Sequence, residues 1–116
     1  MRFTRLYTGT DDESHFEDVG IPLTARGSFS RLSDLERATG IVFRETSGDY
    51  FIDWHNAPRR QYVIGLEGEV EIEVGDGTRR RFGPGDVFLA EDTAGRGHVS
   101  RAVNNQPRKS IFVTLE

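Results

Sequence analysis

The sequence predicts an all-β protein that folds as one domain. Turn-forming glycines, prolines and asparagines recur along the chain, and short runs rich in β-branched and aromatic residues lie between them. One segment also alternates strictly between charged and apolar residues. Short strands at this spacing are typical of a β-sandwich or β-barrel. The length of 116 residues is within the usual range of a single domain.

The first part of the chain is expected to contribute an edge strand and one helical turn. Residues 1–30 are polar and irregular, and we expect them to wrap around the body or to extend a sheet. Ser33 and Glu36 have the spacing of a capping box, in which each side chain bonds to the other's backbone amide. Gly40 follows at a position where a left-handed residue ends a helix. We therefore predict a short helix or single turn over residues 34–39.

The alternating segment is predicted to be a strand with one face in water. Glutamates alternate with apolar residues over Glu69–Val74, which is the period-2 pattern of a half-buried strand. A three-residue loop after it would pair Glu73 with Arg79, whereas a two-residue loop would pair Val74 with Arg79. We favour the three-residue loop, closed by a left-handed glycine, because opposite charges then face each other. The triple arginine Arg79–Arg81 is then a sheet face and not an anion-binding site.

Composition excludes several classes of function. The 15 basic and 19 acidic residues give a net charge of −4, which disfavours a nucleic-acid partner. The absence of cysteine excludes disulfides, zinc fingers, iron–sulfur clusters and cysteine nucleophiles. No apolar stretch approaches the roughly 18 residues of a membrane helix, and the N-terminus has no signal-peptide pattern. We therefore expect a cytoplasmic protein whose partner is a small-molecule ligand.

Two segments carry the candidate chemistry. His98 follows a long polar loop after the predicted strand 86–90, and loops of this kind often border sites. Residues 53–62 place aromatic, amide and basic side chains at the head of an apolar strand, a mixture typical of a concave binding wall. The candidate substrate-binding residues are Trp54, His55, Asn56, Arg59, Gln61 and Tyr62.

Each candidate also has a purely structural interpretation. His98 could be a core histidine bonded to a neighbouring carbonyl group, and His55 could be a surface residue at a strand end. Trp54 could belong to the core, since large aromatic residues dominate cores. We expect Glu91 and Asp92 to be solvated loop charges, with the alternative that one of them orients His98.

The second half of the chain resembles the conserved barrel of the cupin superfamily. Gln61 and Gly68 reproduce the E-x6-G spacing of the first cupin motif, with Gln in place of Glu. Pro84 and the glycine after it resemble the turn of the second motif, and His98 resembles its histidine. The resemblance implies an antiparallel jelly-roll barrel over residues 46–116, with the first 45 residues as an arm. It also implies a homodimer.

The resemblance is incomplete at the metal ligands. Metal-binding cupins usually hold the ion with three histidines and one glutamate, whereas the carboxylate position here is an amide. Depending on the gap, the first two histidine positions fall on Trp54 and Asn56 or on His55 and Ala57. Two alternatives stay open: the protein binds no metal cofactor, or His98 and His55 hold a divalent ion weakly.

These observations predict a cupin-like protein that acts on a small organic molecule. His98 would serve as a general acid and base in non-redox chemistry of the isomerase or lyase type. Asn56, Gln61 and either Arg59 or Arg60 would orient the substrate. Trp54 would form an apolar wall with Tyr62. The alternatives are a non-catalytic ligand-binding protein and a metal-dependent, dioxygenase-like enzyme.

Overall fold

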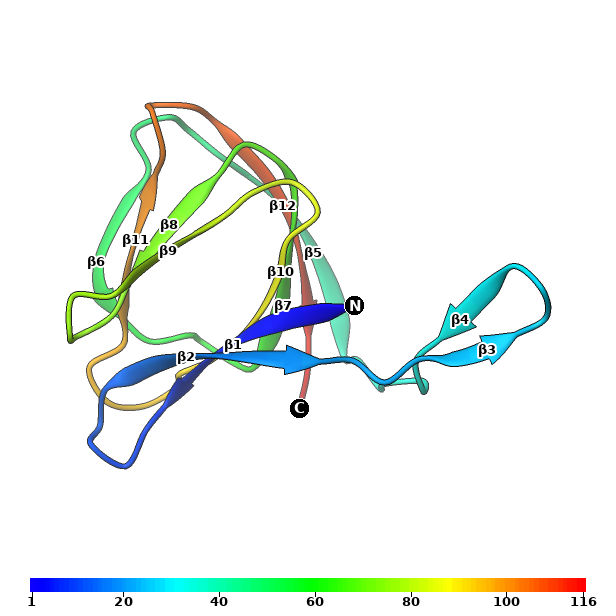
Figure 1. Cartoon of the computed structure of the whole chain (residues 1–116). Helices are drawn as coiled ribbons and strands as arrows, with labels where there is room; N and C mark the ends of the chain where they lie inside the picture. Colours follow the sequence, from blue (N-terminus) through cyan, green and yellow to red (C-terminus); the bar gives the residue numbers. More distant parts are fainter.

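Two β-sheets face each other across the core in the computed structural model, which describes residues 1–116 (Figure 1). The larger sheet has the strand order β2-β1-β10-β7-β12-β5, and the smaller has the order β6-β11-β8-β9. A third, two-stranded sheet is the hairpin β3-β4. The bounds are β1 Arg2–Thr8, β2 Ser14–Gly20, β3 Thr24–Arg26, β4 Ser30–Leu32, β5 Gly40–Thr46, β6 Phe51–His55, β7 Gln61–Glu67, β8 Val70–Glu73, β9 Arg79–Phe82, β10 Val87–Glu91, β11 His98–Ala102 and β12 Arg108–Thr114.

The predicted all-β class is confirmed, and the core lies between the two sheets. Alternate side chains point to opposite faces of a strand, so one face of each sheet supplies the core. The buried cluster is apolar and draws on both sheets: Leu6, Ala57, Val63, Val70, Ile72, Val74, Phe82, Phe88 and Ala90. β1 pairs parallel with β10, so the larger sheet is mixed and not wholly antiparallel. No helix of the structure has the length and apolar character needed to cross a membrane.

The predicted helical turn over residues 34–39 is wrong. This segment has no regular secondary structure and connects β4 to β5. Ser33 Oγ donates to the carbonyl oxygen of Asp34, and Glu36 accepts a hydrogen bond from the hydroxyl of Tyr62, so neither side chain caps a helix. A single helical turn is too short to be stable without such caps. The carboxylate of Glu36 binds Tyr62 instead of the backbone amide that it would cap.

The N-terminal strands close one side of the molecule. β1 and β2 add to the larger sheet, with β2 at its edge. Arg80 of β9 donates a 2.7 Å hydrogen bond to Asp18 of β2, and its guanidinium lies 5.2 Å above the ring of Phe16. Phe16 in turn packs at 6.3 Å from Phe82. These contacts join the sheets on the β2–β9 side, opposite the edges formed by β5 and β6.

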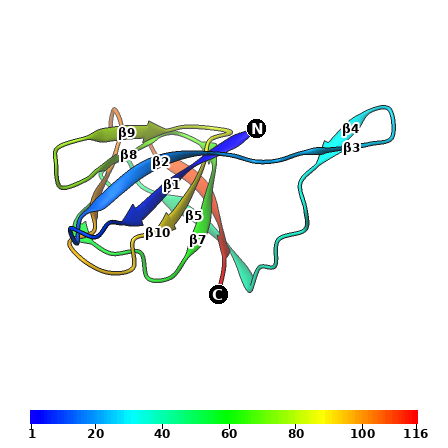
Figure 2. The same cartoon turned by 60° about the horizontal axis from the view of Figure 1, so that its bottom comes forward.

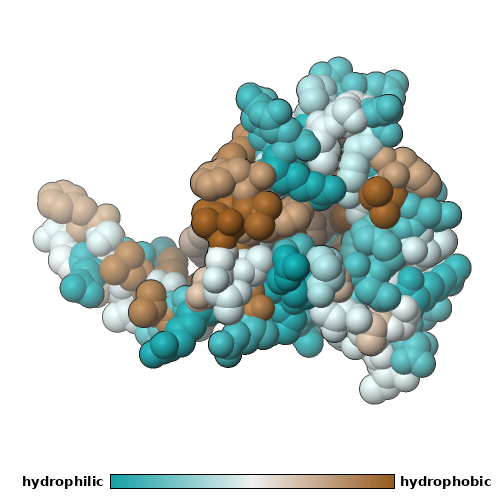
Figure 3. Space-filling model, turned by 180° about the vertical axis from the view of Figure 1, so that it is seen from behind, coloured by the Kyte–Doolittle hydropathy of each residue, from teal (hydrophilic) through white to brown (hydrophobic).

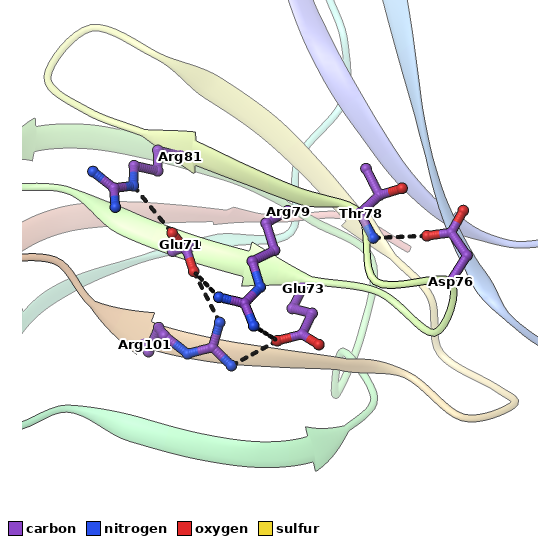
Figure 4. Close-up of polar contacts among 7 residues, drawn as sticks. All are labelled: Glu71, Glu73, Asp76, Thr78, Arg79, Arg81 and Arg101. Atoms are coloured by element: carbon purple, nitrogen blue, oxygen red, sulfur yellow. Dashed lines mark hydrogen bonds and ion pairs between the residues drawn. The ribbon is translucent and has the colours of Figure 1, made fainter.

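The predicted register of the β8–β9 hairpin is confirmed. Glu73 pairs with Arg79 and Glu71 with Arg81, and the three-residue loop contains Gly77 with a left-handed φ of 88°. Figure 4 shows the resulting ion pairs, which extend to Arg101 of β11. Arginines and glutamates therefore neutralise one another along this sheet face. The interpretation of the triple arginine as a sheet face holds.

The β3–β4 hairpin projects away from the body as an arm (Figures 1 and 2). All six of its strand residues are exposed. Its tip residue Phe29 and the following Leu35 have exposed fractions of 102% and 95%. Figure 3 shows hydrophobic surface on this arm and on the nearby body, where β5 exposes Ile41 and Phe43.

Candidate functional site

A cavity of about 250 Å³ lies between the sheets, toward the β5 and β6 edges. This is just below the roughly 300 Å³ at which drug-sized pockets begin, so the cavity suits a small organic molecule. About half of its lining is apolar, and no aspartate or glutamate lines it. The polar residues in the lining are Arg44, Tyr50, His55, Asn56, Gln61, His98, Ser100 and Arg108.

His98, the first residue of β11, is buried in the cavity wall with 5% of its surface exposed. Its Nδ1 lies 2.5 Å from Oδ2 of Asp92, and Ser14 Oγ donates a 2.6 Å hydrogen bond to the same oxygen. An ionised carboxylate only accepts hydrogen bonds, so the proton of the neutral imidazole lies on Nδ1. Nε2 is then left with a lone pair. The arrangement holds a base in the wall of the cavity.

Asp92 is completely buried, so the prediction of a solvated loop charge is wrong for this residue. The alternative, that one of the two acids orients His98, is confirmed for Asp92. The reason is the alternation of side chains at the end of β10. Glu91 points outward and binds Arg5 and Arg60, whereas Asp92 points between the sheets. Burial opposes ionisation of Glu91, but these two arginines hold its pKa below the ordinary value.

His55 lies beside His98, and the two ring centroids are 4.3 Å apart. β6 pairs with β11 so that these two histidines face each other, and both line the cavity. Nδ1 of His55 is 2.7 Å from the carbonyl oxygen of Asp53, which fixes the ring. Burial is the main cause that lowers the pKa of His55 below its ordinary value, and the neighbouring His98 adds to this shift when it is protonated. A neutral His55 therefore accompanies His98 in this wall.

Gly97 makes the close approach of these two histidines feasible. It has a left-handed φ of 79°, and a Cβ at this position would overlap the carbonyl oxygen of His55. Only glycine adopts this conformation at no steric cost. Asn56 holds the same loop by donating hydrogen bonds of 2.9 and 3.0 Å to the carbonyl groups of Ala94 and Gly95. Together they fix the backbone that presents His98.

Arg108 is a buried cation without an acidic partner. Only 6% of its surface is exposed, it lines the cavity, and its Nε and Nη2 have no hydrogen-bond partner. Burial, and then the charge of Arg44, lowers the pKa of Arg108 from its ordinary value. An unpaired buried donor costs about 1–3 kcal/mol, and more when it is charged. The guanidinium of Arg44 lies 4.9 Å from the ring of Tyr50, at the same end of the cavity.

The strand register places different chemistry at the two ends of the cavity. Gln61 pairs with Ala90, two residues before the Asp92 that binds His98, and with Thr114 at the last position of β12. Arg108 is the first residue of β12, so it lies at the opposite end. Gln61 Oε1 is buried and has no partner. The acid–base group and an amide therefore share one end, and the two arginines share the other.

The structure divides the predicted substrate-binding residues into two groups. His55, Asn56 and Gln61 line the cavity, whereas Trp54, Arg59 and Tyr62 do not. Neighbouring residues of a strand point to opposite faces, which separates Trp54 from His55 and Tyr62 from Gln61. The residues that the sequence analysis missed are Ser14, Arg44 and Arg108. The alternation of side chains along their strands places these residues on the inner face. The sequence alone cannot show which face is the inner one, because that depends on how the strands pair.

The three predicted residues outside the cavity have other contacts or lie on the surface. Trp54 carries the guanidinium of Arg96 at 4.2 Å from its ring. Tyr62 packs edge-on against Phe3 with centroids 5.4 Å apart. Burial and the hydrogen bond to Glu36 raise the pKa of Tyr62 to about 12. Arg59 is exposed. The predicted apolar wall of Trp54 and Tyr62 is therefore absent from the cavity, where Val63 and other core residues take its place.

The donor set does not fit the metal centre of the cupin resemblance. His55 and His98 are adjacent, but no group of three or more histidine, aspartate or glutamate side chains comes together in a position to hold an ion. Asp92 is engaged by His98 and Ser14 and does not itself line the cavity. Gln61 supplies an amide where metal-binding cupins have a carboxylate.

Comparison with known proteins leaves the family open. No protein-family model matches the chain, and no curated protein matches it at a significant level. A crystal structure of a conserved protein of unknown function from Streptococcus pyogenes is similar to 72% of this chain and 71% of that chain, with 21% identity and a TM-score of 0.49.

Proposed function

We propose that the protein is a cupin-like jelly-roll barrel that binds a small organic molecule between its sheets and transfers a proton with His98. The proposal is supported by the two facing sheets and by a cavity of about 250 Å³ that opens on His98. The observation that carries it is the buried chain from Ser14 through Asp92 to His98. A histidine fixed in this way at a cavity wall has the arrangement of a general base.

The chemistry that this arrangement supports is proton transfer at carbon next to a carbonyl group. Nε2 of His98 takes the proton, and the C–H electron pair moves to form an enolate. The imidazolium then returns the proton to the same carbon, which isomerises the molecule, or protonates a leaving group that the enolate expels from the β carbon. Asp92 stabilises the imidazolium, as a carboxylate hydrogen-bonded to Nδ1 does. The amide of Gln61 at the same end is positioned to bond the enolate oxygen. No redox cofactor is required, so the reaction is of the isomerase or lyase type.

The experiment is solvent-deuterium exchange followed by proton NMR. The purified protein is incubated in D2O with a panel of small ketones, aldehydes and oxo acids that includes 4-oxopentanoate. We expect the wild type to exchange the protons next to the carbonyl group of at least one compound. His98→Gln should lose about 10²–10⁴-fold in rate, which is the usual contribution of a general acid–base group. His15→Gln, which removes a histidine outside the cavity, is the matched control.

Three outcomes contradict the catalytic proposal as stated. Exchange that is equal in wild type and His98→Gln would remove His98 from the role of base. Saturable binding of a panel compound without exchange would make the protein a ligand-binding module instead. Exchange that appears only after loading with Mn, Fe, Ni, Cu or Zn, and that requires both His55 and His98, would assign a metal-dependent enzyme.

A further inference from the structure

We propose that the Arg108 end of the cavity binds a carboxylate group, and that the substrate is therefore a small organic acid. This inference rests on the proposed function in one respect, because it takes the cavity to be the place where the substrate binds. It adds the charge of the substrate and the direction in which it lies. The carboxylate would be held near Arg108 and Arg44, with the remainder of the molecule extending toward His98.

The first argument is the missing partner of Arg108. Its side chain is more than nine-tenths buried and lines the cavity, and two of its guanidinium nitrogens have no hydrogen-bond partner. The nearby charged group is another arginine, Arg44, which adds repulsion. A buried charge is normally paired or binds an ion. An anionic ligand is the partner that this end of the cavity lacks.

The second argument is the contrast with arginines on the surface. Arg80, Arg81 and Arg101 are all more exposed than Arg108, and each forms an ion pair with a carboxylate of this chain. The chain thus pairs arginines where water already screens them, and leaves its most buried arginine unpaired. A purely structural arginine would show the reverse. An open position for a ligand explains the difference.

The third argument concerns the kind of anion. Arginine presents its donors in a planar fork that matches a carboxylate. Phosphate groups are typically bound by several backbone amides at a helix N-terminus or glycine-rich loop, and the wall around Arg108 is made of strands. Apolar residues make up about half of the cavity lining, among them Val63, Val70 and Phe112. A monocarboxylate with a short, mainly apolar chain therefore fits better than a phosphate.

The experiment compares two molecules of the same shape but different charge. Thermal-shift and NMR titrations at constant ionic strength use 3-methylbutanoate, its neutral analogue 3-methylbutanamide, and inorganic phosphate. We expect the carboxylate alone to raise the Tm and to shift the Nε–H resonance of Arg108. Arg108→Gln should weaken carboxylate binding at least tenfold. Arg59→Gln, which removes an exposed arginine outside the cavity, should leave it unchanged.

The outcomes separate this inference from the proposed function. His98→Gln should retain carboxylate binding, so that loss of exchange in that variant bears on catalysis alone. Equal binding of the acid and the amide, or unchanged binding in Arg108→Gln, would overturn the carboxylate subsite. Stronger binding of phosphate than of the carboxylate would overturn the assignment of a carboxylate. If Arg108→Gln fails to fold, the wild type still provides the test. An Arg108 Nε–H resonance that does not shift when the carboxylate is added would overturn the carboxylate subsite.

Discussion

Asp92 has no contact with solvent, yet the chemistry of the site depends on it. Its carboxylate accepts hydrogen bonds from His98 and Ser14 through one oxygen, and its other oxygen has no partner. The carboxylate sets which nitrogen of His98 carries the proton and stabilises the imidazolium that forms when His98 takes a proton. Asp92 is thus a positioning residue that acts through His98.

Replacement of Asp92 separates this positioning role from a purely structural one. Asp92→Asn keeps the size of the side chain but offers His98 an amide, which permits the wrong tautomer. We expect the deuterium-exchange rate to fall by about 10²–10⁴-fold and binding of 3-methylbutanoate to persist. The nitrogen NMR shifts of His98 report the tautomer directly. Unchanged shifts together with an unchanged rate would contradict the role of Asp92.

His55 makes the stability of the fold depend on pH. Burial and the neighbouring His98 lower the pKa of His55 in the folded state, whereas in the unfolded chain this pKa has its ordinary value of about 6.5. The unfolded state therefore binds the proton more readily, so this contribution to stability is present above about pH 6.5 and is lost as the pH falls below it. Asp92 opposes the shift, and Arg44 adds to it.

The corresponding measurement is the Tm between pH 7.5 and pH 5. We expect the wild type to lose stability over this range and His55→Gln to lose less, because the glutamine binds no proton. His15→Gln, on the surface beside Asp11, controls for the removal of one histidine. Parallel pH profiles for wild type and His55→Gln would show that His55 does not titrate as described.

For individual residues, the sequence indicates which polar loops border the site, but it does not indicate which charged side chains face inward. His98 could be singled out because few histidines exist and it follows a long polar loop. The prediction that Asp92 is a solvated loop charge is wrong. A carboxylate in a loop is usually hydrated, and only the fold shows that this one turns inward. Arg108 could not be predicted because its direction depends on the pairing of β12 with β7 and β5, strands distant in sequence.

The β8–β9 hairpin shows what local sequence does determine. Its register follows from the alternation of charges and from a short loop with glycines, and both are contained within a few residues. The helical turn at residues 34–39 failed for the opposite reason. Its capping signal was local, but Glu36 is used instead by Tyr62, a residue far along the chain.

Gly77 provides the test for this hairpin. It has a left-handed φ of 88°, and a Cβ there would meet no neighbouring atom, so Gly77→Ala introduces backbone strain without a clash. We expect a loss of about 1–2 kcal/mol in the free energy of unfolding. Gly20→Ala, at an equally open position where φ is not left-handed, is the control and should cost less. Equal losses in denaturant titrations of the two variants would contradict the role of the turn.

The whole molecule is an open body with an extended arm, 46 × 34 × 25 Å along its principal axes. The arm exposes Phe29, Leu32 and Leu35, and β5 has a free edge with exposed Ile41 and Phe43. Exposed apolar surface next to a free strand edge is typical of an interaction site. We propose that a second copy of the chain covers this surface, which agrees with the homodimer implied by the cupin resemblance.

The oligomeric state follows from light scattering coupled to size-exclusion chromatography. We expect the mass of two chains for the wild type and of one chain for the double variant Phe29→Ser, Leu35→Ser. Both side chains are almost fully exposed, so the substitutions should leave the fold of each chain intact. Leu66→Ser changes a half-exposed leucine on the body and serves as the control. A monomeric wild type would contradict the dimer.

The most direct measurement is an NMR titration of the wild type with 4-oxopentanoate, which carries a carboxylate at one end and a ketone at the other. The side-chain signals of Arg108 Nε–H and His98 Nε2 are followed together. If one organic acid occupies the cavity from the arginine end to the base, both signals shift with the same Kd, and Arg108→Gln weakens both. Shifts at neither residue, or at His98 alone with no effect of Arg108→Gln, would contradict a site for organic acids between the sheets.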